Sequence, residues 1–166
     1  MIREPARLKA GLLLALLILV LDQGAKWWVL EVINLPQVRR IVVTSFFNLT
    51  MVWNRGVTFG LLASDYWWKP LLLGGLALAV AGFLLVWLAR AESRLVAIGL
   101  GSVIGGAVGN VIDRARFGAV VDFLDFHAFG FHWYAFNVAD AAIVCGVGML
   151  MLDALIRPSA EVKHSP

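Results

Sequence analysis

Residues 136–156, FNVADAAIVCGVGMLMLDALI, form a stretch that is apolar and long enough to cross a lipid bilayer as one helix. Its first turn nevertheless carries two polar residues, Asn137 and Asp140. A carboxylate at the centre of a membrane span costs about 2.5–3.5 kcal/mol, and less near the ends of the span. We therefore expect another part of the chain to supply a partner or a polar pocket for Asp140.

The composition extends this membrane prediction to the whole chain. Of its 166 residues, 61% are hydrophobic and only 15% are charged, whereas about a quarter of the residues in soluble domains are charged. The net charge of +3 is small and the basic residues are scattered, so nucleic acid is not an expected partner. A single cysteine, Cys145, allows no disulfide within the chain and is expected to be a buried, inert thiol. The sequence predicts one integral membrane domain, 1–166.

Three further stretches are apolar and long enough to span a membrane. The four together predict an all-α polytopic membrane protein with transmembrane helices at about 8–30, 70–89, 95–112 and 136–156. The first span lacks a small-x-small cleavage pattern after its apolar run, which favours a retained anchor over a cleaved signal peptide. Three basic residues lie before or at the start of this span and favour cytoplasmic N- and C-termini: Arg3, Arg7 and Lys9.

The segments predicted to lie outside the cytoplasm are 31–69 and 113–135. The first contains IVVTSFFNLTMVWN, residues 41–54, whose β-branched and aromatic residues predict strands. We expect a small β-like platform there, at the membrane surface. The stretch 57–68 is rich in aromatic residues and is interpreted as an anchor in the membrane interface, with substrate contact as the alternative.

Small residues recur at every fourth position of the third span, at Ala97, Gly101, Gly105 and Gly109. This spacing gives one side of a helix a smooth face, where another backbone can approach closely. Packing within the bundle is the favoured explanation of this face. Docking of a substrate helix is the alternative.

Four spans that begin on the cytoplasmic side bring most of the acidic residues to one face of the membrane. Several acids that converge on one side indicate a polar pocket, and ionisable residues in membrane segments commonly mark a functional site. The residues that gather there are Asp22, Asp113, Asp122, Asp125 and Asp140, with Asn54, Asn110 and Asn137.

Two of these acids have a structural explanation in their neighbours. Asp22 and Lys26 are spaced i, i+4 and are expected to pair on the first helix. Asp113 is followed by Arg114 and lies one turn after Asn110, which favours capping and ion pairing at a helix end. We expect mainly structural roles for both acids.

Asp122 and Asp140 differ, because neither has a basic residue nearby in the sequence. Two such carboxyls in one pocket share a proton, since adjacent anions repel each other. One is then a base and the other an acid at the same pH, as the attack of water on an amide requires. Asp125 is the competing candidate, but a surface pair with His127 explains it.

Other catalytic chemistries find no support in the sequence. The histidines His127, His132 and His164 lack the spacing of metal ligands, and there is no glycine-rich phosphate loop. The serines have no evident general base. We expect no metal and no other cofactor.

Five motifs, LDQGAK, NRGVTFG, GGAVGNVIDR, VVDF and FNVAD, occur in this order across the four spans. In this combination they resemble the bacterial lipoprotein signal peptidases, also called signal peptidase II. The resemblance covers about residues 12–155 and implies an aspartic endopeptidase of the inner membrane. Such an enzyme removes the signal peptide of a prolipoprotein by cutting before a cysteine that carries a diacylglyceryl group. The implied partners are these prolipoproteins and membrane lipids, and we expect a monomer.

The resemblance also implies roles for individual residues. The family's two catalytic aspartates match Asp122 and Asp140. Its other polar motif residues, thought to shape the pocket and hold the substrate or the pair of aspartates, match Asp22, Lys26, Asn54, Gly56, Asn110, Asp113, Arg114 and Asn137. Asn54 and Asn137 are candidates for holding the peptide backbone or the oxyanion. The chain departs from the family pattern at Gly24-Ala25, where a Ser or Thr is common, and at Thr58-Phe59, where Ala-Phe is frequent.

Two other functions explain the polar residues less well. A small proton- or cation-coupled transporter would use the buried acids as a relay, but transport predicts polar residues through the whole membrane. A structural assembly factor that uses the small-residue face leaves Asp122 and Asp140 without a purpose. Cleavage of lipoprotein signal peptides is therefore the predicted function, with transport as the alternative.

Overall fold

The computed structural model describes residues 4–56 and 68–156. Most of the aromatic stretch 57–68, including Thr58-Phe59, and the basic residue Arg3 lie outside the described residues. The elements in chain order are α1 (Pro5–Trp27), the π-helical turn η1 (Trp28–Val32), α2 (Leu35–Val38), β1 (Arg40–Val42), β2 (Phe47–Asn54), α3 (Lys69–Leu88), α4 (Arg94–Phe117), β3 (Val120–Ala128), β4 (Phe131–His132) and α5 (Val138–Ile156).

Four helical segments within the described residues are long and apolar enough to cross a membrane: Pro5–Val32, Lys69–Leu88, Arg94–Phe117 and Val138–Ile156. With the small antiparallel sheet, they confirm the predicted fold class. The third span differs from its prediction, because α4 continues five residues beyond 112 to Phe117. Basic side chains in its last turn suit the helix dipole, and Gly118 ends the helix in the left-handed conformation, at φ +68°. Asp113 and Arg114 are therefore helical residues rather than loop residues.

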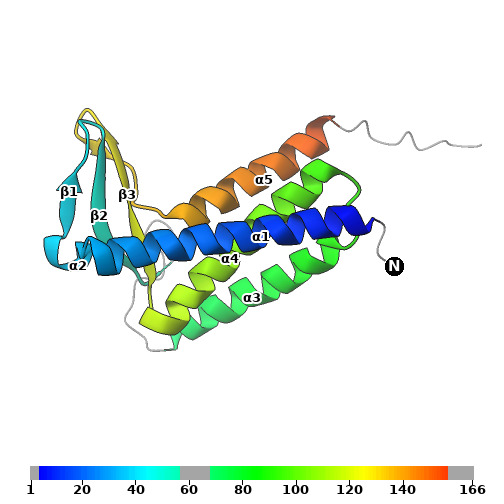
Figure 1. Cartoon of the computed structure of the whole chain (residues 1–166), viewed down its shortest axis with the longest axis horizontal. Helices are drawn as coiled ribbons and strands as arrows, with labels where there is room; N and C mark the ends of the chain where they lie inside the picture. Colours follow the sequence, from blue (N-terminus) through cyan, green and yellow to red (C-terminus); the bar gives the residue numbers. More distant parts are fainter. Residues whose placement is uncertain (1–3, 57–67, 157–166) are drawn as a thin grey trace, which may run out of the picture.

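Helix α4 is the central helix of the bundle. About 67% of its most apolar window is buried, against 17–22% for the other three spans. Figure 1 shows α4 crossing behind α1, with α3 and α5 on opposite sides. At its start, the side chain of Ser93 caps α4 by accepting a hydrogen bond from the backbone nitrogen of Val96, at 3.0 Å.

The small-residue face of α4 packs inside the bundle, which confirms the favoured explanation of that spacing. A Cβ added at Gly101 would meet the backbone of Gly11 in α1, and one at Gly105 would meet the backbone of Ala15. The two helices approach so closely that only small residues fit between them. This contact fixes α1 against α4 and thereby sets which of their polar side chains meet.

A four-stranded antiparallel sheet, in the order β1-β2-β3-β4, lies beyond the end of the bundle (Figure 1). One face of it packs on η1 and α2 through a small apolar core that contains Val29, Leu35, Leu49, Val121 and Phe123. The prediction of strands in residues 41–54 is confirmed by β1 and β2. Strands β3 and β4, in residues 113–135, were not predicted, although β3 carries Asp122.

Cys145 contradicts its prediction. Its side chain is exposed on the surface of α5 rather than buried. The apolar residues around it in the sequence face the lipid, because α5 buries only a narrow stripe against α4.

Candidate active site

A cluster of buried polar side chains lies where the bundle meets the sheet. Helices α1, α4 and α5 and strands β2 and β3 all contribute to it. Its members are Asp22, Gln23, Lys26, Asn54, Asn110, Asp113, Arg114, Asp122, Asn137 and Asp140. The fold therefore brings together residues that are far apart in the sequence.

Lys26 is the charged centre of this cluster, and its side chain is almost fully buried. Its ammonium nitrogen lies 2.8 Å from Oδ2 of Asp22 and 2.7 Å from Oδ2 of Asp113. It also donates to Oδ1 of Asn110, at 3.2 Å. The predicted pair with Asp22 is confirmed, and all three donors of the ammonium group are used.

Asp113 is paired with Lys26 rather than with the adjacent Arg114. It also accepts hydrogen bonds from the backbone nitrogen of Val121, at 3.1 Å, and from the side chain of Gln23, at 3.1 Å. Since it is fully buried, it joins α1, the end of α4 and the start of β3. These contacts agree with the structural role expected for Asp113, although with a different cation.

Gln23 was not selected as a site residue, yet its amide nitrogen donates to Oδ2 of Asp22, Oδ1 of Asp113 and the carbonyl of Gly109. Its place within the LDQGAK motif was the only sequence signal for it. Asp22 in turn accepts a hydrogen bond from the backbone nitrogen of Ala139, at 2.9 Å. This contact satisfies a free donor at the start of α5, the helix of Asp140.

Asp122 accepts a hydrogen bond at each of its carboxylate oxygens. The amide nitrogen of Asn137 donates to Oδ1 at 2.7 Å, and that of Asn54 donates to Oδ2 at 3.0 Å. The side chain is only 1% exposed. Both amides thus hold Asp122 in place, which is one of the roles that the resemblance implies for the polar motif residues.

Asp140 lies in the first turn of α5 and is connected to Asp122 through two asparagines. Asn110 donates to Oδ1 of Asp140 at 2.8 Å, and Asn137 donates to the side-chain oxygen of Asn110 at 3.2 Å. The side-chain oxygen of Asn137 accepts from the backbone nitrogen of Asp140, at 2.8 Å, and so caps α5. The amide of Asn137 therefore contacts the carboxyl of Asp122 and the backbone of Asp140.

Arg114 lies beside the two carboxyls. Its guanidinium donates to the carbonyl oxygens of Asn110, at 3.3 Å, and Gly56, at 3.4 Å, and it is close enough to attract the charges of Asp140 and Asp122. The two acids lack a basic residue nearby in the sequence, but in the fold Arg114 is such a neighbour. The packing of α4 against β3 and α5 brings Arg114 close to the two acids.

Gly56 meets the cluster through its backbone alone. Its nitrogen donates to the side-chain oxygen of Asn54, at 3.1 Å, and its carbonyl accepts from Arg114. It thereby fixes the orientation of the amide that donates to Asp122.

The surroundings of Asp122 favour its protonated form. The pKa of Asp122 is raised from 3.8 to about 7, chiefly by burial and next by the charge of Asp140. Hydrogen bonds from Asn54 and Asn137 oppose this rise, because they stabilise the carboxylate. A carboxyl with such a pKa exchanges protons near neutral pH, as a general acid or base needs to do.

Asp125 lies apart from this cluster, and its predicted surface pair with His127 is wrong. Asp125 is buried, and its Oδ1 lies 2.8 Å from Nδ1 of His132. Its Oδ2 accepts from Asn48 at 3.1 Å and from Thr50 at 2.9 Å. Burial raises the pKa of Asp125, but these hydrogen bonds outweigh it, and the pKa lies below its usual value. Asp125 is thus a structural acid of the sheet.

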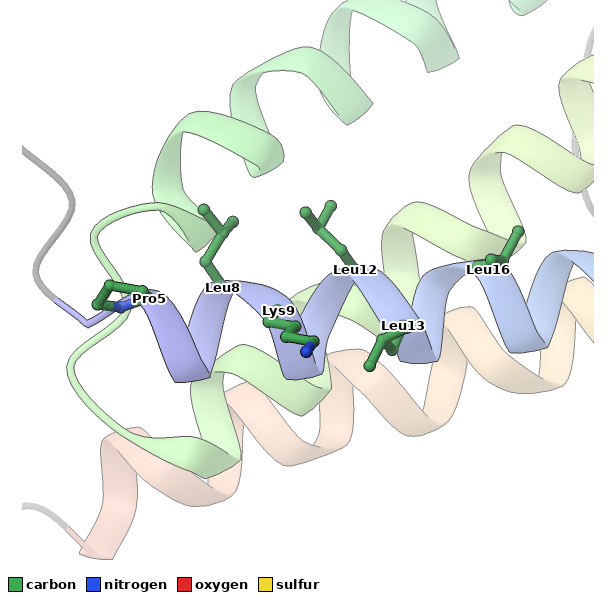
Figure 2. A pocket seen from close by; sticks show the side chains of 6 residues that line it. All are labelled: Pro5, Leu8, Lys9, Leu12, Leu13 and Leu16. Carbon is green, nitrogen blue, oxygen red and sulfur yellow. The ribbon is translucent and has the colours of Figure 1, made fainter.

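An apolar groove of about 330 Å³ lies far from these carboxyls, on the first turns of α1. Figure 2 shows its lining side chains, Pro5, Leu8, Lys9, Leu12, Leu13 and Leu16. Lys9 is the one ionisable group among them, so the groove offers no acid–base pair. Within 4–56 and 68–156, no group of three or more His, Cys, Asp or Glu side chains is arranged to hold a metal ion.

Comparison with known proteins links this site to a family. The family model described as signal peptidase (SPase) II matches residues 14–156. A lipoprotein signal peptidase from Methylobacterium sp. (strain 4-46) is 46% identical over 145 residues, which cover 87% of this chain and 88% of that protein. One from Rhodopseudomonas palustris (strain TIE-1) is 45% identical over 161 residues, covering 94% and 96% respectively.

Solved structures agree with the fold. A bacterial membrane enzyme determined by the in meso method at 2.3 Å superposes with a TM-score of 0.76, covering 94% of this chain and 93% of that chain at 23% identity. A second, at 1.9 Å, gives a TM-score of 0.74 at 25% identity, covering 90% and 94%. The structures support the fold, and the match over residues 14–156 together with the two relatives identifies the family. This chain belongs to the signal peptidase II family.

Proposed function

We propose that this protein is an aspartic endopeptidase that removes signal peptides from prolipoproteins, with Asp122 and Asp140 as its catalytic residues. Membership in the signal peptidase II family makes it a membrane-bound protease, and its relatives are named lipoprotein signal peptidases. The observation that supports the aspartic mechanism is the connection of Asp122 to Asp140 through Asn137 and Asn110. The other two carboxyls of the described cluster, those of Asp22 and Asp113, are each bonded directly to Lys26.

The proposed pair shares one proton. Asp22 and Asp113 each contact the ammonium group of Lys26 directly, whereas burial and the charge of Asp140 raise the pKa of Asp122 to about 7. A proton held between two close carboxyls leaves one as a base and the other as an acid at the same pH. The two titrate as a coupled pair, so the proton belongs to the dyad rather than to one residue.

The ionised member of the pair takes a proton from a water molecule as the water oxygen attacks the scissile carbonyl carbon. This step forms a tetrahedral intermediate. The protonated member then gives its proton to the amide nitrogen, and the carbon–nitrogen bond breaks. The products are a peptide with a new carboxyl terminus and a peptide with a free amino terminus. Asn54, Asn110 and Asn137 act as positioning residues, because they bond to the carboxyls themselves.

The substrate is proposed to arrive from the bilayer. Helices α3 and α5 each pack on α4 and lie on opposite sides of it (Figure 1), and the substrate helix is proposed to dock on α4 between them. A signal peptide helix that enters there brings its cleavage site to the first turn of α5, where Asp140 lies. The diacylglyceryl chains on the cysteine after the cleavage site would then remain in the lipid. Such chains favour this arrangement, because each buried CH₂ group contributes about 0.8 kcal/mol.

We propose the bacterial inner membrane as the location, with both termini cytoplasmic and the active site near the outer face. The basic residues at the start of α1 support this orientation. Transport is not favoured as a function. Ionisable groups gather at one end of the bundle, and at the other end Asp153 accepts a hydrogen bond from Ser93, at 2.6 Å. We expect a monomer to suffice, because every member of the cluster comes from one chain.

The test is cleavage of a synthetic prolipoprotein, with and without the diacylglyceryl group, by purified protein. Asp122→Asn and Asp140→Asn are each expected to lower the turnover by about 100-fold or more, since general acid–base groups contribute about 10²–10⁴. Asp153→Asn is the matched control, because it changes a buried acid of the same helix away from the site. Turnover at the wild-type rate by either test variant removes that residue from the proposed pair.

A further inference from the structure

The hairpin of β3 and β4, with the two residues that follow it, carries a group of exposed aromatic side chains, which we call the aromatic tip. Its members and their exposed fractions are Phe129 (109%), Phe131 (86%), Trp133 (73%) and Tyr134 (58%). Phe46, which is 55% exposed, belongs to the neighbouring turn, and its carbonyl accepts a hydrogen bond from the backbone of His127. Contiguous apolar surface of this kind marks a site of contact with another molecule or with a membrane.

Folding alone does not explain Phe129. It has a φ of +52° and is followed by Gly130 at +81°, between the paired residues Ala128 and Phe131. Two-residue turns of this kind favour Asn-Gly, because both central residues have positive φ. A bulky residue there costs about 1–2 kcal/mol relative to one suited to the turn. The ring of Phe129 is fully exposed within the described residues. A contact with another molecule or with lipid would offset the cost of placing Phe in this turn.

The tip is held out beside the bundle. Strands β2 and β3 run across the direction of the helices, and their turn ends project sideways past the start of α5 (Figure 1). Tyr134 precedes α5 by only four residues, so the tip stays near the end of that membrane span. A structure that extends sideways at this level lies over the lipid next to the helix.

The chemistry of the tip also fits lipid. Between Asp125 and Asp140 the chain has no Asp, Glu, Lys or Arg. The tip consists of Phe, Trp and Tyr. Trp and Tyr are enriched at membrane–water interfaces because their apolar rings carry a polar group, and the two Phe rings add apolar surface. Behind the tip, the stacked rings of His127 and His132, 4.8 Å apart, and the contact of His132 with Asp125 stiffen the hairpin.

We propose that the aromatic tip inserts into the interfacial layer of the bilayer beside α5 and anchors the sheet there. Strand β3 runs from this tip to Asp122, so the anchor fixes how deep Asp122 lies relative to the lipid. The contact of the aromatic tip with lipid does not depend on the proposed catalytic role of Asp122. Only the inference that this anchor sets the depth of catalysis rests on that role.

Depth-dependent fluorescence quenching tests the proposal on the whole protein in lipid vesicles. The emission of Trp133 is obtained as the difference between wild-type protein and Trp133→Phe. It is expected to be quenched by lipids with a nitroxide near the headgroup more than by lipids with a nitroxide at the chain end, and to be protected from aqueous iodide. Strong quenching by iodide without quenching by lipid would overturn the proposal.

A double variant, Phe129→Asn with Phe131→Thr, separates anchoring from folding. Asn suits the turn and Thr suits a strand, so the melting temperature in detergent is expected to stay the same or to rise. Quenching of Trp133 by the headgroup label is expected to be lost. Val38→Asn, which removes an exposed apolar side chain from α2 instead, is the matched control and should leave the quenching unchanged.

Two further results would overturn the proposal. Unchanged lipid quenching in the double variant would mean that α5 alone holds Trp133 near the bilayer. Protection of Trp133 only after a second protein is added would assign the tip to a protein partner. Repeating the measurement with Asp140→Asn keeps the result independent of catalysis, because quenching should be retained in a protein that does not cleave.

Discussion

The side-chain nitrogen of Asn137 lies 2.7 Å from Oδ1 of Asp122, while the side-chain oxygen of the same amide caps the helix that carries Asp140. The amide group of Asn137 thus links β3, which carries Asp122, to α5, which carries Asp140. A side chain that only donates or only accepts cannot make both contacts. The separation of the two acids therefore depends on this amide.

Asn137→Asp separates the two roles of that amide. Aspartate caps a helix as well as asparagine does, so the helix is retained, but it cannot donate to Asp122 and it adds a negative charge. A hydrogen bond to a charged group contributes about 1.5–3 kcal/mol, so we expect turnover to fall by about 10- to 100-fold. The measurement is the cleavage rate together with thermal unfolding by circular dichroism. Asn137→Ala, which also loses the cap, should be less stable than Asn137→Asp by about 0.5–2 kcal/mol. Equal activity in Asn137→Asp and wild-type protein would contradict the positioning role.

The raised pKa of Asp122 predicts how its substitution changes stability with pH. The folded protein holds this proton up to about pH 7, whereas the unfolded chain loses it near 3.8. Stability is therefore present in full below the ordinary pKa and is lost as the pH rises from about 4 to 7. Asparagine does not ionise and escapes this loss. We expect the melting temperature of Asp122→Asn, relative to wild-type protein in the same detergent, to rise between pH 5 and pH 8; a constant difference would show that Asp122 has an ordinary pKa.

Lys26 supports the buried carboxylates of Asp22 and Asp113. Replacement by methionine keeps much of the volume but leaves two buried acids without their cation. Breaking a buried ion pair from one side costs about 3–5 kcal/mol, so we expect Lys26→Met to give little folded protein. Adding Asp113→Asn to this variant removes one of the stranded charges and should recover part of the folded yield. Lys9→Met is the control, since Lys9 is an exposed lysine of the same helix; the measurement is the yield of monodisperse protein after purification.

The sequence was sufficient for features that depend on local spacing. Continuous apolar stretches predicted the four helices, and the i, i+4 spacing predicted the pair of Asp22 with Lys26. It was not sufficient for contacts that depend on how helices cross. Lys26 also contacts Asp113, which lies 87 residues later in the sequence, on α4. This contact depends on the close approach of α1 and α4 at Gly11 and Gly101.

The sheet shows the same division. Strand β3 has the β-branched and aromatic residues that predicted β1 and β2, so it was within reach of the sequence. The partner of Asp125 was not, because a hairpin places His132 opposite His127. His127 is two residues from Asp125 in the chain, but the return of β4 brings His132 within bonding distance instead. Register across a turn decides this contact, and composition does not specify it.

Gly109 makes room for the carboxylate of Asp22, which predicts a specific effect of one added methyl group. A Cβ at this position would lie 2.5 Å from Oδ2 and 3.2 Å from Cγ of Asp22. Asp22 would have to move, and its bonds to Lys26 and to the backbone of Ala139 would lengthen or break. Inserting atoms into a packed interior costs about 1–3 kcal/mol.

We therefore expect Gly109→Ala to lower the melting temperature and, because Ala139 is next to Asp140, to lower turnover as well. Gly24→Ala is the matched control: it adds the same methyl group two residues from Asp22, where nothing lies within 4 Å. Since alanine is a better helix former by about 1 kcal/mol, this control should be as stable as wild-type protein or more so. Unfolding in detergent and cleavage of the same substrate measure both effects. If Gly109→Ala matches Gly24→Ala in both, the start of α5 does not depend on the position of Asp22.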